Sequence, residues 1–116
     1  MDIKTELNEC FSPDWNGYGA ESISDEAVKY ASVIYNYFDV KPSLGADPDG
    51  MVTLEWYVNK GYLLNVSVDK LGNCYYVYVD EEINLKENGQ FHISKMDFLT
   101  KFRILNKNLT KPSKSI

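Results

Sequence analysis

The sequence has little of the chemistry from which most catalytic and metal sites are built. Its 116 residues include one histidine and two cysteines. Cys10 and Cys74 stand far apart and outside any CxxC pair, which argues against a disulfide framework and against a zinc site. Nucleophilic catalysis needs a base beside a serine or cysteine, and the single histidine, His92, lies next to an expected edge strand. We therefore expect a protein that is not an enzyme and has no catalytic residues, metal or cofactor.

Long apolar runs are missing as well. An uncharged apolar stretch such as residues 30–38 is far shorter than the roughly 20 residues that a membrane span needs. The N-terminus carries Asp2, Lys4, Glu6 and Glu9, so it lacks the apolar core of a signal peptide. These absences predict a cytoplasmic protein that makes no contact with a membrane.

Positive charge is scarce and unevenly placed. The net charge is −5; residues 1–93 hold 6 basic and 16 acidic residues, whereas residues 94–116 hold 6 basic residues and one acidic. An acidic body argues against nucleic-acid binding, which needs a basic surface to release counterions. It is compatible with binding a basic protein. It is also compatible with mere solubility and with a basic tail that packs against its own acidic domain.

The strongest pattern that is present is a turn opening into an alternating segment. Residues 47–50, Asp-Pro-Asp-Gly, combine a proline that presets φ with a glycine that accepts a positive φ. After this turn residues 52–58 alternate, and two more alternating runs, 62–69 and 74–80, follow at hairpin distance. An antiparallel meander of three to five strands is expected, with residues 43–46 as a candidate first strand.

Helical patterns lie on both sides of these strands. Residues 1–11 place apolar side chains at helical spacing. Ser24 is a good N-cap before an acidic first turn, and an apolar stripe then runs to Phe38. Ser94, three residues before Asp97, is a variant of the capping box and opens a C-terminal helix. Its expected apolar face is Phe98, Leu99, Phe102 and Leu105.

These elements predict an α+β fold, in which the N-terminal helices and the C-terminal helix pack on one face of the meander. One domain is expected over residues 1–110, followed by a flexible basic tail over 111–116. Residues 81–93 are ambiguous. Asn88-Gly89 is a hairpin signal, after which residues 91–93 would return as a short edge strand.

The two sides of the expected sheet differ. The covered side would hold Val52, Leu54, Trp56, Val58, Leu64, Val66, Val68, Tyr75, Val77 and Val79. The opposite side would hold Thr53, Glu55, Tyr57, Leu63, Asn65, Ser67, Cys74, Tyr76 and Tyr78. Tyrosines on neighbouring strands stabilise a solvated sheet face through cross-strand contacts. Tyrosine is also enriched at interfaces, so we predict that Glu55, Tyr57, Tyr76 and Tyr78 form a partner-binding surface.

A glycine-containing segment, residues 14–20, has two interpretations. Glycines give a loop its backbone freedom, and Trp15 and Tyr18 would pack such a loop down. The alternative is a ligand loop of Trp15, Asn16, Gly17, Tyr18 and Gly19, because glycines let a backbone approach a phosphate. The GxGxxG and GxxxxGK[ST] spacings are absent. In this alternative Trp56 would help to stack a ring, and a homodimer sharing one pocket is left open.

Two motifs resemble an uncharacterised family of small bacterial and phage-borne proteins. The first is the loop Asp-Trp-Asn-Gly-Tyr-Gly-Ala at 14–20 with the helix start at 22–26. The second is Pro-Asp-Gly at 48–50 with Leu-Glu-Trp at 54–56. The resemblance covers about residues 13–80 and implies a common fold and a shared site between the two motifs, with no established activity to transfer.

Size and charge add an analogy, since small acidic proteins of bacteria and phages often serve as antitoxins, immunity proteins or inhibitors of defence systems. The leading hypothesis is therefore a non-enzymatic protein that binds and blocks a protein partner. The alternative is a sponge for a small ligand or nucleotide.

Overall fold

The computed structural model describes residues 3–11, 15, 17, 19 and 22–105. In chain order its elements are α1 (Ile3–Glu6), η1 (Asn8–Phe11), α2 (Asp25–Tyr37), β1 (Ser43–Ala46), β2 (Val52–Asn59), β3 (Tyr62–Val68), β4 (Asn73–Asp80), η2 (Glu81–Ile83), β5 (Leu85–His92), η3 (Ile93–Lys101) and η4 (Arg103–Leu105), where η marks a 3₁₀ helix. The predicted α+β fold with an antiparallel sheet is confirmed. In the part of the chain described, no helix has the length and apolar character to cross a membrane.

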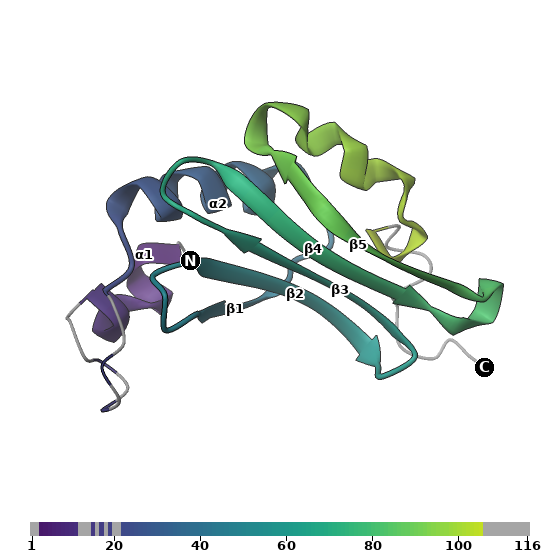
Figure 1. The fold of residues 1–116 in the computed structure, drawn as a ribbon, viewed down its shortest axis with the longest axis horizontal. Helices are drawn as coiled ribbons and strands as arrows, with labels where there is room; N and C mark the ends of the chain where they lie inside the picture. Colours follow the sequence, from purple (N-terminus) through teal and green to yellow (C-terminus); the bar gives the residue numbers. More distant parts are fainter. Residues whose placement is uncertain (1–2, 12–14, 16, 18, 20–21, 106–116) are drawn as a thin grey trace.

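The sheet is a five-stranded meander in the order β1-β2-β3-β4-β5, and each neighbouring pair is antiparallel (Figure 1). The turn chemistry read from the sequence at residues 47–50 forms the connection from β1 to β2, and a second glycine turn connects β3 to β4. Gly50 has a φ of 90°, and its N–H donates to the carbonyl of Asp47 at 2.9 Å. Gly72 has a φ of 83° and donates to the carbonyl of Asp69 at 3.1 Å. Glycine is suited to both positions because it adopts a positive φ without steric cost.

Helix α2 begins at the predicted cap. The Oγ of Ser24 accepts the N–H of Ala27 at 3.0 Å. The buried side chains of α2 are Ala27, Val28, Ala31 and Ile34, and the helix contacts β2 and β3. In Figure 1, α2 and the segment after β5 both run along the upper side of the sheet. Their buried residues belong to one hydrophobic core with the buried side chains of β2 and β3.

Strand β4 presents the face opposite to the one predicted. Val68 on β3 lies directly across from Cys74, and side chains directly across from one another share a face of the sheet. The covered residues of β4 are therefore Cys74, Tyr76, Tyr78 and Asp80, all of them buried. The other side of β4 carries Tyr75, Val77 and Val79. Val58, also predicted to be covered, lies at an irregularity in the β2–β3 register and is 44% exposed.

Residues 85–92 form one uninterrupted strand, so the hairpin expected at Asn88-Gly89 is wrong. Tyr76 on β4 pairs with Gly89. A Cβ on Gly89 would come within 3.2 Å of the Tyr76 ring. The glycine therefore makes room for a buried aromatic ring in the neighbouring strand, and this tertiary contact overrides the local turn signal.

The predicted C-terminal helix is replaced by 3₁₀ turns. They begin one residue before Ser94, and within η3 Lys95 has non-helical angles (φ −116°, ψ 21°). The cap is the His92 side chain, whose Nδ1 accepts the N–H of Ser94 at 3.2 Å. The capping box read from the sequence is therefore not the one that forms.

Aromatic side chains pack these turns against the sheet. Phe98 and Phe102 lie 5.2 and 5.6 Å from the ring of Tyr76, and Phe102 stacks on Tyr78 at 4.2 Å. Phe91 of β5 lies 6.0 Å from Tyr76 and completes a group that we call the aromatic cluster. Such ring pairs add stabilisation beyond the area they bury, and here they hold the chain after β5 against β4.

Candidate functional site

The four residues predicted to bind a partner do not lie on one surface. Tyr76 and Tyr78 are 7% and 1% exposed, inside the aromatic cluster. Tyr57 is 59% exposed, and the half-buried Glu55 shares its face of the sheet. The prediction of a single surface formed by all four is therefore wrong, because β4 turns Tyr76 and Tyr78 toward the core. Partner binding by Glu55 and Tyr57 stays a prediction.

Tyr76 anchors the C-terminal segment instead. Its hydroxyl donates to Glu87 Oε2 at 2.6 Å, and Lys101 Nζ donates to the same oxygen at 2.9 Å. Lys101 also lies 4.3 Å above the ring of Phe98. Burial and the bond to Glu87 raise the pKa of Tyr76 to about 12. The hydrogen bonds from Tyr76 and Lys101 hold the pKa of Glu87 below its ordinary value.

Tyr78 belongs to a second anchor of the same design. Its hydroxyl donates to Asp80 Oδ2 at 2.8 Å. Arg103 binds both oxygens of Asp80, with its Nε at 2.6 Å and an amino nitrogen at 2.9 Å, and it also binds Glu82. The bonds from Arg103 hold the pKa of Asp80 below its ordinary value, although burial alone would raise it. Two tyrosine–carboxylate–cation sets thus fasten the chain after β5 to the sheet.

Sequence reasoning missed these anchors. One signal was available: Tyr76, Tyr78 and Asp80 alternate, so a buried tyrosine face on β4 brings the aspartate inward with it. The cations of the anchors could not be predicted from the sequence, because Arg103 lies 23 positions from Asp80 and no local rule pairs them.

The side of the sheet that carries Glu55 and Tyr57, opposite the buried side chains, is named the open face. Its apolar part, the apolar patch, consists of Tyr57, Leu63, Tyr75, Val77 and Val79 on three neighbouring strands. Leu63 pairs with both Tyr57 and Val79, which makes the patch continuous from β2 to β4. Tyr57, Tyr75 and Val77 are 59%, 39% and 46% exposed.

A carboxylate, that of Glu55, lies beside this patch. Glu55 is half-buried, and its side chain has no hydrogen bond or ion pair to any residue of the described ranges. A hollow of about 200 Å³ opens next to it, lined by Ser43 and Tyr57 among others. Lys41, the basic residue of the described lining, donates instead to the carbonyls of Tyr35 and Phe38 at 2.6 and 2.8 Å. Glu55 is the one acidic side chain among the lining residues that the structure describes.

The other end of the open face is polar and internally bonded. Asp47 Oδ1 accepts from Thr53 Oγ1 at 2.9 Å, and Asp47 Oδ2 accepts from Ser67 Oγ at 3.3 Å. These bonds tie the β1–β2 turn to the sheet. Because its carboxylate is occupied in this way, Asp47 is a poorer site for a cation than Glu55.

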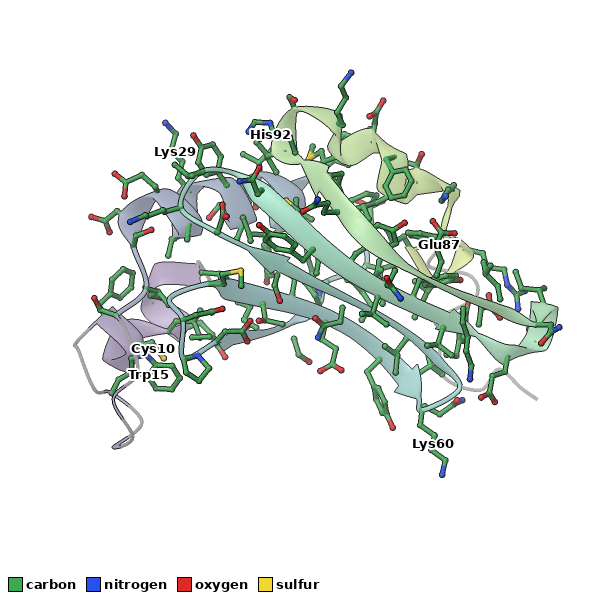
Figure 2. All side chains as sticks on the ribbon, viewed as in Figure 1. Cys10, Trp15, Lys29, Lys60, Glu87 and His92 are labelled. Carbon is green, nitrogen blue, oxygen red and sulfur yellow. The ribbon has the colours of Figure 1, made fainter. Side chains whose placement is uncertain are left out.

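The predicted ligand loop is only partly described. Trp15 is half-buried against the core at the end of the molecule where α1 lies (Figure 2). Gly17 and Gly19 are exposed and have φ values of 79° and 83°, whereas Asn16 and Tyr18 lie outside the described residues. Trp56 is 3% exposed, and its Nε1 donates to the Val40 carbonyl at 2.7 Å. The expected stacking of a ligand ring on Trp56 is therefore wrong, because its ring is core.

A larger hollow of about 580 Å³ lies between the end of α2 and the turns η3 and η4. Its two basic lining residues are Lys101 and Arg103, and both are bound to carboxylates of the anchors. This arrangement gives a phosphate no free cation among the lining residues that the structure describes, which weakens the nucleotide-sponge alternative.

Of the four predicted partner-binding residues, Glu55 and Tyr57 thus lie on the open face together with the apolar patch. Family membership stays a prediction from the motifs at residues 14–20 and 48–56. No protein-family model matches the chain, and no match to it was found among curated proteins or solved structures.

Proposed function

We propose that this chain is a non-enzymatic binding protein whose open face holds and blocks a protein partner. The observation that carries the proposal is Glu55, which is half-buried beside the exposed apolar patch and has no side-chain partner among the residues that the structure describes. The partner's contact surface would be apolar at its centre, with an arginine or lysine that enters the hollow at Glu55. The proposal takes the helices and the C-terminal turns to pack together on the other face of the sheet.

The shape of the open face supports a protein rather than a small molecule. Neighbouring strands lie about 4.8 Å apart, so a patch spanning three strands covers a width of about 10 Å on the surface of the sheet. Small ligands need concave sites of about 300–1,000 Å³, and the hollow at Glu55 is about 200 Å³. That volume suits one side chain. Exposed tyrosine and aliphatic side chains beside a charged rim are typical of protein interfaces.

Charge supports a basic partner. The chain has a net charge of −5, which favours encounter with a positively charged protein. Occupying the partner's surface is sufficient for inhibition, so an antitoxin, an immunity protein or an inhibitor of a defence system would work in this way.

Selection of displayed random peptides on the immobilised full chain tests the proposal. We expect enriched peptides to combine apolar residues with arginine or lysine, because these complement the patch and Glu55. Val77→Lys should abolish their binding. Val33→Lys is the matched control, since Val33 lies on α2 and is 44% exposed against 46% for Val77. Peptides that bind both variants equally well would contradict the proposal.

Glu55→Gln is expected to weaken the selected peptides about tenfold or more, because a hydrogen bond to a charged group contributes about 1.5–3 kcal/mol. The substitution keeps the size of the side chain and removes its charge. Titration of peptide at several salt concentrations measures both the affinity and its salt dependence, which should become weaker in the variant. An unchanged affinity and salt dependence would remove Glu55 from the site.

A further inference from the structure

Strand β5 leaves one long edge of the sheet unpaired in the described structure. It is the terminal strand of the sheet, eight residues long, and it pairs with β4 without a register shift (Figure 1). It contains no proline, and Lys86, Asn88, Gly89 and Gln90 are exposed. Such an edge is a template for another strand.

The hydrogen-bond pattern shows which backbone groups face outward. Two backbone hydrogen bonds at the strand ends show which residues of β4 and β5 direct their backbone groups toward each other. The N–H of Ile93 donates to the Gly72 carbonyl at 2.8 Å, and the N–H of Glu81 donates to the Gly61 carbonyl at 2.9 Å. Residues 85, 87, 89 and 91 direct their N–H and C=O toward β4. The backbone groups of Lys86, Asn88 and Gln90 therefore point away from the sheet.

We propose that a second copy of this chain pairs with this edge, antiparallel and around a two-fold axis at Asn88. This register opposes Asn88 to Asn88 of the second copy and Lys86 to Gln90 of the second copy, each as a hydrogen-bonded pair. All outward groups of residues 86, 88 and 90 are then satisfied. A single ten-stranded sheet results, with the two open faces on the same side.

The charges along β5 are compatible with a second copy in this register. Glu87 comes opposite Gly89 of the second copy, and Lys86 opposite Gln90, so no like charges face each other directly across the new strand pair. Glu87 is in addition neutralised by Lys101 within its own chain, at 2.9 Å. The two-fold arrangement uses β5 of both copies and closes on itself, so it gives a dimer rather than a fibre. The proposal is independent of what the open face binds.

Asn88→Pro in the full chain tests the edge. Proline at position 88 removes the outward N–H at the centre of the proposed strand pair. The hydrogen bonds to β4 come from the neighbouring residues and are kept, and edge strands tolerate proline. Sedimentation over a wide range of protein concentration should show a dimer for the native chain and for Asn88→Ala. The dimer of Asn88→Pro should be at least about tenfold weaker. A native chain that stays monomeric, or an Asn88→Pro dimer of unchanged affinity, would overturn the proposal.

Cysteine cross-linking tests the register and does not depend on how well proline is tolerated. Directly opposed hydrogen-bonded residues have Cα atoms about 5.5 Å apart, within the span of a disulfide. Mild oxidation should therefore link Asn88→Cys into a covalent dimer. Lys86→Cys should not link, because Lys86 faces Gln90 of the second copy. The native cysteines, Cys10 and Cys74, are buried. Failure of Asn88→Cys to link, or equal linking by Lys86→Cys, contradicts the two-fold register.

Discussion

Arg103→Met is expected to lower the free energy of unfolding by about 3–5 kcal/mol, because it leaves a buried carboxylate without its cation. Asp80 is fully buried, and Arg103 holds both of its oxygens at 2.6 and 2.9 Å. Methionine retains an unbranched apolar chain at this position, so most of the loss comes from the missing charge. Denaturant unfolding at neutral pH measures the change.

Lys101→Met is the matched control for this prediction. Lys101 binds Glu87 at 2.9 Å in the same way, but the side chains of this pair are 48% and 28% exposed. Exposed ion pairs contribute about 1 kcal/mol or less. The double variant Asp80→Asn with Arg103→Met should recover part of the loss, because no buried charge is then left unpaired. Equal losses for Lys101→Met and Arg103→Met would contradict the assignment of Asp80 as a buried partner.

The pH dependence separates the missing charge from the missing packing. In the native chain the bonds from Arg103 depress the pKa of Asp80. Its stabilisation is therefore present above the unfolded pKa of about 3.9 and is lost as the pH falls further. Without Arg103 part of this depression is lost, because only the bonds from Tyr78 and from the backbone of Ile83 then oppose the effect of burial, so the variant gains less stability than the native chain as the pH rises. The stability difference between the two chains should grow from acidic to neutral pH. A difference independent of pH would indicate packing alone.

Local chemistry was sufficient to predict the meander and α2. The turn at residues 47–50 and the cap at Ser24 each act within a few residues, so the sequence around them contains the whole cause. Glu55 and Tyr57 were placed on the open side correctly, because they alternate with the strongly apolar residues of β2. That half of the candidate site could be read from periodicity.

The face of β4 could not be read in this way, because its residues are apolar on both sides. The valines suggested that one face of β4 is covered, and the tyrosines suggested the other. The groups that favour burial of the tyrosines lie far away in the sequence. The hydroxyl of Tyr76 bonds to Glu87, which Lys101 also binds. The hydroxyl of Tyr78 bonds to Asp80, which Arg103 also binds. A buried tyrosine needs such a partner, and sequence alone does not supply its position. For the same reason Tyr75 and Val77 were missed as members of the apolar patch.

A comparison of Tyr78→Ala with Tyr75→Ala tests the orientation of β4 directly. The two residues have the same side chain on the same strand, but they are 1% and 39% exposed. Truncation of a large buried aromatic ring costs about 3–5 kcal/mol, and Tyr78→Ala also removes the stacking on Phe102 at 4.2 Å and the bond to Asp80. We therefore expect Tyr78→Ala to fall in this range or to prevent folding.

Tyr75→Ala should cost about 1 kcal/mol or less, because only cross-strand contacts on the open face are lost. Thermal and denaturant unfolding of both variants measure the two values. If Tyr78→Ala prevents folding, Tyr78→Phe keeps the comparison quantitative: it removes only the hydroxyl and should cost about 1–3 kcal/mol, against no measurable loss for Tyr75→Phe. A reversed order in either pair would mean that β4 turns Tyr75 to the core, and Tyr78 would then return to the open face as a binding residue.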